Sequence, residues 1–135
     1  MIVIDSSIAI AAFASWHEHH KRARSVVGAA PSLVVHSLLE TYSVLTRLPE
    51  PHRVAATAVS TYLERQFSHP PIALDRKRQY SLVGRMAGAG IVGGAVYDAL
   101  IAMTVQAHDA TLVSLDARAA RTYERCGVRF ELLTP

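Results

Sequence analysis

The sequence contains a single cysteine and no long apolar run, and each shortage excludes a class of protein. Cys126 alone cannot form a disulfide within the chain, and zinc sites built from several cysteines are excluded by the same count. No apolar run approaches the roughly 18 residues of a membrane-spanning helix, because Asp5 interrupts the first stretch and residues 17–24 end the second. The first residues also lack the basic region of a secretory signal. We therefore expect a cytoplasmic protein without membrane contact.

Length and composition predict one globular domain that spans residues 1–135. Apolar residues make up 50% of the chain and charged residues 19%, which is typical of a compact protein rather than a disordered one. The net charge is +3, and Lys21 and Lys77 are the only lysines among 14 basic residues. Arginine suits phosphate better than lysine does, so a nucleic-acid partner is permitted, although a solvated basic surface would give the same composition.

The apolar pattern predicts short strands that alternate with longer helices. Strands are expected at 1–4, 32–35, 72–74, 111–115 and 128–132, and helices at 6–14, 16–27, 36–48, 54–67, 75–87, 95–108 and 117–125. Such alternation favours an α/β fold in which a central parallel sheet of four to five strands carries helices on both faces. Sites in these sheets lie beyond the carboxyl ends of the strands, and chemistry is expected there. The glycine pattern G-x-G-x-x-G at 88–93 follows a helix instead of a strand, so we interpret it as a helix end and loop.

Four acidic residues fall at that end of the predicted sheet. Asp5 and Asp116 each follow a strand, whereas Glu40 and Asp98 lie early in the helices after the sheet. Each has a simpler interpretation by itself. Asp5 and Asp116 could cap a helix, Asp98 could be a first-turn acid favoured by the helix dipole, and Glu40 could be a rim position. The shared location of all four favours a common function.

Four neighbouring carboxylates would repel one another by about 1 to 4 kcal/mol per pair at effective dielectric constants of about 80 to 20. Without a cation, at least one would take up a proton. A hard divalent cation removes the conflict, and oxygen-only ligation favours Mg²⁺ or Mn²⁺. The sequence shows no pair of nucleophile and base, and none is needed if a metal-bound water attacks a phosphate. One ion or two would serve.

Four segments resemble, in order and spacing, the acidic motifs of PIN-domain ribonucleases, and the closest branch is the VapC toxins of bacterial toxin–antitoxin pairs. These segments are MIVIDSS, HSLLETYSVLTRLP, VYDALIAMTVQAH and TLVSLDARA. The resemblance covers essentially the whole chain and implies a PIN fold. It also implies a Mg²⁺- or Mn²⁺-dependent endoribonuclease that cuts single-stranded or looped RNA. In that case, the catalytic and metal-binding residues are Asp5, Glu40, Asp98 and Asp116.

The same resemblance assigns supporting residues and partners. Ser114 matches a position that the family usually fills with a hydroxyl, and Ser6 and Ser7 match the small polar pair after the first acid. The implied partners are a VapB-type antitoxin, an RNA substrate (tRNA, rRNA or mRNA) and a second copy of the chain. Electrostatics adds that an antitoxin arginine suits the acidic pocket, because a guanidinium can bridge two carboxylates.

Basic residues outside the acidic motifs are candidate RNA contacts. They are Lys21, Arg22, Arg76, Arg78 and Arg118. A solvated surface is the simpler interpretation of each. The alternative function is a non-catalytic RNA-binding module that uses these residues, with the four acids serving as structural caps.

Overall fold

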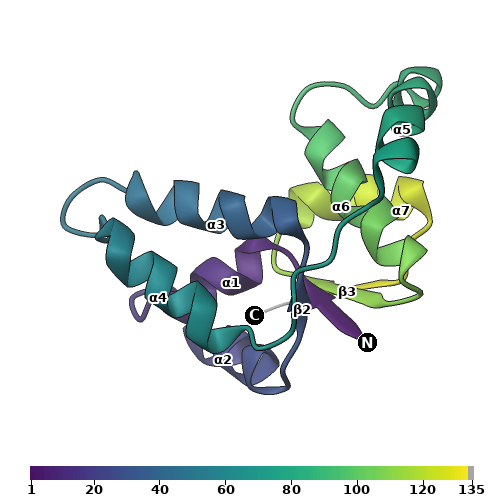
Figure 1. Cartoon of the computed structure of the whole chain (residues 1–135). Coiled ribbons are helices and arrows are strands. Elements are labelled where there is room, and N and C mark those ends of the chain that lie inside the picture. The colour runs from purple at the N-terminus through teal and green to yellow at the C-terminus, as the bar shows by residue number, and fades with distance from the viewer. Residues whose placement is uncertain (134–135) are drawn as a thin grey trace.

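Four short parallel strands form the centre of the computed structural model, which describes residues 1–133 (Figure 1). They are β1 (Ile2–Ile4), β2 (Ser32–Leu33), β3 (Thr111–Ser114) and β4 (Phe130–Leu132). The strand order is β2-β1-β3-β4, so β1 lies between β2 and β3. Val3 pairs with Ser32 on one side and with Leu112 on the other. The carboxyl ends of β1 and β3 therefore lie next to each other.

Helices cover both faces of this sheet, as Figure 1 shows, with α1 to α4 on one side and α5 to α7 on the other. The helices of the described chain are α1 (Ser6–Phe13), α2 (His20–Gly28), α3 (Val35–Thr46), α4 (Ala56–Gln66), α5 (Arg76–Ala89), α6 (Ala95–Ala107) and α7 (Ala117–Cys126). None of these helices is long and apolar enough to cross a membrane. The α/β fold predicted from the alternation of strands and helices is confirmed.

The alternation of side chains along β1 creates the two layers. Successive strand residues point to opposite faces of a sheet. Ile4 packs in a core with residues of α1 to α4, while its neighbour Val3 packs in a second core with residues of α6 and α7. A third cluster, which includes Leu82 and Ala99, holds α5 against α6. Asp5 comes directly after Ile4, at the carboxyl end of β1 where the two helical layers meet.

Local signals explain where several helices begin and end. Asp5, Asp75 and Asp116 are the N-caps of α1, α5 and α7, and each side chain accepts a backbone N–H of the first turn. Gly90 and Gly127 end α5 and α7 in the left-handed conformation that glycine adopts without strain. The interpretation of residues 88–93 as a helix end and loop is therefore confirmed for Gly90.

Two predicted elements differ from the structure. The helix expected from residue 16 begins at His20, because residues 15–19 form turns in which the His17 ring accepts the backbone N–H of His19 at 3.1 Å. The strand expected at 72–74 is reduced to a single bridge between Ile72 and Val34. The two prolines before Ile72 have no N–H to donate, so the pairing cannot extend in that direction either.

Candidate active site

The fold brings the four predicted acids to one end of the sheet. Asp5 and Asp116 stand at the adjacent ends of β1 and β3, while Glu40 and Asp98 come from α3 and α6. The pKa of Asp98 is raised to about 6, first by burial and then by the negative charges of Asp116, Glu40 and Asp5. The other three carboxyl groups are therefore within electrostatic reach of Asp98.

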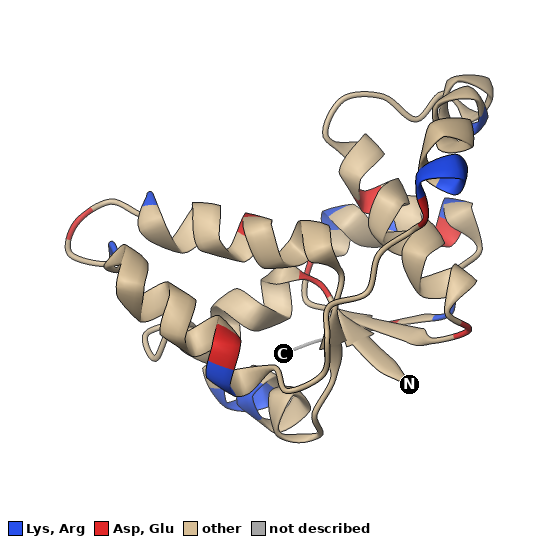
Figure 2. Cartoon of the chain, in the orientation of Figure 1, with Lys and Arg blue, Asp and Glu red and all other residues tan. Residues whose placement is uncertain are grey.

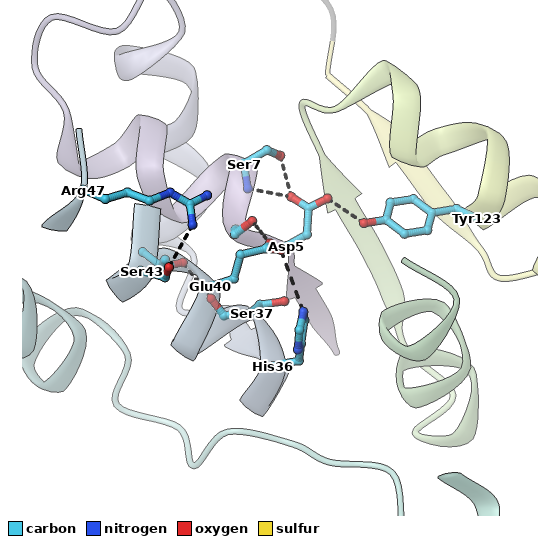
Figure 3. Close-up of polar contacts among 10 residues, drawn as sticks. Asp5, Ser7, His36, Ser37, Glu40, Ser43, Arg47 and Tyr123 are labelled. Carbon is cyan, nitrogen blue, oxygen red and sulfur yellow. Dashed lines mark hydrogen bonds and ion pairs between the residues drawn. The ribbon is translucent and has the colours of Figure 1, made fainter. Parts of the chain in front are cut away.

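Asp5 is the most enclosed of the four, with a side chain that accepts hydrogen bonds on both oxygens (Figure 3). The residue is only 3% exposed. Its Oδ1 accepts from the backbone N–H of Ser7 at 3.1 Å and from the Ser7 hydroxyl. Its Oδ2 accepts from the hydroxyls of Ser114 and Tyr123, the latter at 2.8 Å. Burial raises the pKa of Asp5, and these hydrogen bonds oppose that shift by stabilising the charged form.

The two serines connect Asp5 to the chain that follows β3. The Ser7 hydroxyl accepts the backbone N–H of Leu115 at 2.8 Å, and the Ser114 hydroxyl accepts that of Asp116 at 3.0 Å. Each serine hydroxyl thus donates one hydrogen bond to Asp5 and accepts one from a backbone N–H group, so it acts as donor and acceptor at once. The structure places Ser7 and Ser114, the two predicted supporting residues, in direct contact with the first acid.

The two carboxylate oxygens of Glu40 contact Ser6 and His36, respectively. The Ser6 hydroxyl donates to Glu40 Oε1, and His36 Nε2 lies 3.8 Å from Glu40 Oε2. Figure 3 shows His36 one helical turn before Glu40 on α3. The His36 ring stacks face to face on Tyr97, with 4.8 Å between ring centroids and an interplanar angle of 0°. His36 Nε2 has no hydrogen-bond partner within residues 1–133.

Asp116 and Asp98 are more accessible than Asp5. Asp116 is exposed, and its Oδ1 accepts the backbone N–H groups of Arg118 at 2.9 Å and Ala119 at 3.2 Å. The N-cap interpretation of Asp116 therefore holds together with its place in the acidic group. Asp98 is half-buried in the first turn of α6, and the positive charge of Arg118 partly offsets its raised pKa.

The donor chemistry of this group suits a hard divalent cation, because it offers carboxylate oxygens that repel one another. Within the described part of the chain, however, no three His, Cys, Asp or Glu side chains are arranged to hold a metal ion. Asp5 is fixed by its hydrogen bonds, whereas Asp116 is exposed and Glu40 partly so. The accessible carboxylates would have to change rotamer for a cation to be shared.

The predicted RNA-contacting residues do not form one surface. Figure 2 shows α2, which carries Lys21 and Arg22, far from the start of α5, which carries Arg76 and Arg78. All four are exposed. Arg118 lies in the first turn of α7, near enough to Asp98 to lower its pKa. Arg118 is therefore the candidate RNA contact that the structure places beside the acids.

Three aromatic residues next to the acids were missed by sequence reasoning. They are His36, Tyr97 and Tyr123. The sequence carried a partial signal for His36 and Tyr97, because one lies four residues before Glu40 in a predicted helix and the other immediately precedes Asp98. Tyr123 carried none, since a tyrosine on the apolar side of a helix has the pattern of an ordinary core residue.

Comparison with known proteins identifies the family of the chain. The profile of the PIN domain matches residues 2–125. Ribonuclease VapC40 of Mycobacterium tuberculosis is 45% identical over 134 residues, which cover 99% of this chain and 100% of that protein. Ribonuclease VapC27 of the same organism is 38% identical over 137 residues, which cover 94% and 93% of the two chains.

Solved structures support the fold. The complex described as FitAB bound to an IR36 DNA fragment superimposes with a TM-score of 0.70 at 14% identity, covering 98% of this chain and 94% of that one. FitAcB from Neisseria gonorrhoeae gives a TM-score of 0.67 at 16% identity, with 96% of each chain covered. At these identities the likeness concerns the fold alone. Together with the sequence matches over the full length, it leads to one conclusion: the chain belongs to the PIN-domain family and, within it, to the VapC family of ribonucleases.

Proposed function

We propose that this chain is the toxin of a toxin–antitoxin pair and cleaves RNA as a Mg²⁺- or Mn²⁺-dependent endoribonuclease. The observation that carries the proposal is the convergence of four carboxyl groups: burial, and next the charges of the other three acids, raise the pKa of Asp98 to about 6. The names of the VapC40 and VapC27 relatives, both ribonucleases, support RNA cleavage. The choice among tRNA, rRNA and mRNA as substrate stays a prediction, as does the cytoplasmic location.

The residues of the site have distinct roles under this proposal. Asp5, Glu40, Asp98 and Asp116 would supply the oxygen ligands. When bound, a divalent cation lowers the pKa of a water molecule and neutralises charge on the phosphate oxygens. Ser7, Ser114 and Tyr123 fix the orientation of Asp5 through their hydrogen bonds. Arg118, which is exposed and close enough to Asp98 to lower its pKa, is the proposed contact for a substrate phosphate.

One observation supports the alternative function, an RNA-binding module without catalysis. Asp5 and Asp116 do cap α1 and α7, as that alternative requires. Glu40 lies in the middle of α3 and Asp98 inside the first turn of α6, and neither is the N-cap of its helix. Two of the four acids thus have no capping role, which favours the catalytic proposal.

The decisive experiment compares RNA cleavage by the purified protein with Mn²⁺ and with excess EDTA. Cleavage should require the cation and disappear in Asp98→Asn. Asp75→Asn is the matched control, because Asp75 caps α5 away from the acids and asparagine also caps helices. Cleavage that continues in EDTA would contradict the metal-dependent mechanism. RNA binding without any cleavage would favour the alternative module.

An antitoxin is the proposed inhibitor, and its proposed binding site is a groove lined by residues of α3 and α4. The groove has a volume of about 370 Å³ between α3 and α4, and its lining includes Leu39 and Tyr42, which flank Glu40 in sequence. An extended apolar segment could lie there while an arginine reaches the acids. Inhibition should then weaken as Mn²⁺ rises, and arginine-to-alanine scanning of the co-purified partner should find one substitution that abolishes it. If no arginine matters, the guanidinium mechanism is wrong.

A homodimer is the proposed assembly. Apolar side chains remain exposed on α3 and α5, among them Val35 at 39% and Val83 at 65%. Light scattering at micromolar concentration should give twice the mass of 14.7 kDa, whereas a monomeric mass would refute the dimer.

A further inference from the structure

We propose that Tyr97, backed by His36, forms a stacking platform for one nucleobase of the RNA at the edge of the acidic site. This inference rests on the proposed function and adds a subsite to it. The two rings lie parallel with centroids 4.8 Å apart, which is the geometry of a stacked pair. They come from different helices, α3 and α6, so the pair bridges the two helices that carry Glu40 and Asp98.

The outer face of this pair is available to a ligand. The Tyr97 residue is 53% exposed although one face of its ring is covered by His36. An aromatic ring that is held from one side and open on the other presents a preformed surface, and little side-chain freedom remains to be lost when a base stacks on it.

The position of the platform matches the chemistry that RNA requires at this site. Tyr97 immediately precedes Asp98, and His36 lies one helical turn from Glu40, so the platform is at the rim of the acids. Negative charge there repels a phosphate but not a neutral base. Single-stranded RNA is commonly held by stacking of its unpaired bases on aromatic side chains. A base on Tyr97 would therefore anchor a nucleotide where phosphate contacts alone are unfavourable.

The test measures RNA binding separately from cleavage. All variants are made in the Asp98→Asn background, and fluorescence anisotropy follows the binding of labelled oligo(A) and oligo(U) RNA of eight nucleotides. Tyr97→Ala should weaken binding by roughly 5- to 150-fold, the range for loss of one base–aromatic stack. The loss should be greater for oligo(A), because purines offer the larger stacking surface. Tyr97→Phe should retain binding, and Tyr97→Leu should behave as Tyr97→Ala.

Tyr80→Ala is the matched control, because Tyr80 is 85% exposed on α5 and is expected to leave binding unchanged. Equal losses in Tyr80→Ala and Tyr97→Ala would overturn the proposal. Full binding by Tyr97→Leu would also overturn it, since an apolar contact without stacking would then suffice. Light scattering of each variant supplies a third outcome. If Tyr97→Ala changes the mass of the particle, the ring belongs to a subunit contact instead of a base site. Because no cleavage is measured, failure here leaves the proposed nuclease activity untouched.

Discussion

Replacing Tyr123 with phenylalanine tests whether the buried hydroxyl supports the charged form of Asp5. Tyr123 is 1% exposed, and its hydroxyl donates to Asp5 Oδ2 at 2.8 Å. Burial, and next the charge of Asp5, raise the pKa of Tyr123, so the hydroxyl keeps its proton and acts as the donor. Phenylalanine preserves the ring and its edge contact with Phe130, at 5.9 Å between centroids. The substitution therefore removes one hydrogen bond and little else.

The magnitude follows from the charge of the acceptor. A hydrogen bond to a charged group contributes about 1.5 to 3 kcal/mol, against about 0.5 to 1.5 kcal/mol for a neutral pair. In a chain of this size, 1 kcal/mol changes the melting temperature by about 3 to 5 °C. Tyr123→Phe should therefore lower the melting temperature by about 5 to 15 °C. The lower half of that range is favoured because the Ser114 hydroxyl still donates to the same oxygen.

The loss should also depend on pH. The hydrogen bond from Tyr123 lowers the pKa of Asp5 against the effect of burial, so it stabilises the ionised carboxylate more than the protonated acid. The stability difference between wild type and variant should accordingly be larger at pH 8 than at pH 4.5, where Asp5 is protonated in more molecules. Its sign is the same at both values.

Thermal unfolding of three proteins at these two pH values provides the measurement. Tyr62→Phe is the matched control, because the Tyr62 hydroxyl donates at 2.7 Å to the neutral backbone carbonyl of Ala9. Its loss should be smaller and nearly independent of pH. If both variants lose the same stability at both pH values, the charge of Asp5 plays no part and the reasoning is refuted.

Two further predictions concern the acids themselves. The folded pKa of Asp98, about 6, lies above its ordinary value of 3.8. The metal-free folded state therefore binds more protons than the unfolded chain between these values, and stability should fall as pH rises through this range. Urea unfolding should show that Asp98→Asn removes this part of the pH dependence, and an unchanged profile would exclude Asp98 as its source. Asp5→Asn should lower the melting temperature although it relieves repulsion, because its amide N–H₂ would face the donors Ser114 or Ser7. An unchanged or higher melting temperature would show that repulsion dominates.

The sequence predicted that Asp5 and Asp116 lie together because their proximity depends on the strand topology, whereas Glu40 and Asp98 depend on how α3 and α6 pack. Once the strands before Asp5 and Asp116 are assigned to one parallel sheet, their carboxyl ends must lie at the same edge. The family motif assigned Ser114 a supporting position, but it did not predict that the Ser114 hydroxyl donates to Asp5. No comparable rule pairs Tyr123 with Asp5, because that contact spans 118 residues and depends on how α7 packs against β3.

The relative positions of the basic residues could not be predicted from the sequence. Clusters of charge along the sequence suggested candidate contacts on α2 and α5, but the separation of these helices is set by the packing of two different layers. Arg118 differs because its place in the first turn of α7 is fixed by Asp116, its own helix cap. The sequence proposed all five basic residues equally, and only the structure distinguishes Arg118 from those whose position depends on the packing of different layers.

The unequal environments of the acids determine how the proposed site would meet a cation. Asp5 accepts four hydrogen bonds, so its orientation is fixed before any ion arrives, whereas Asp116 is exposed and Asp98 half-buried. The charges of three acids act on Asp98, yet no three acidic side chains of the described chain are arranged to hold a metal ion. This difference between the fixed Asp5 and the accessible acids accounts for that arrangement. Binding would move the accessible acids toward the fixed one and would have to displace a proton from Asp98 below about pH 6. The affinity for Mn²⁺ should therefore decrease as pH falls below this value.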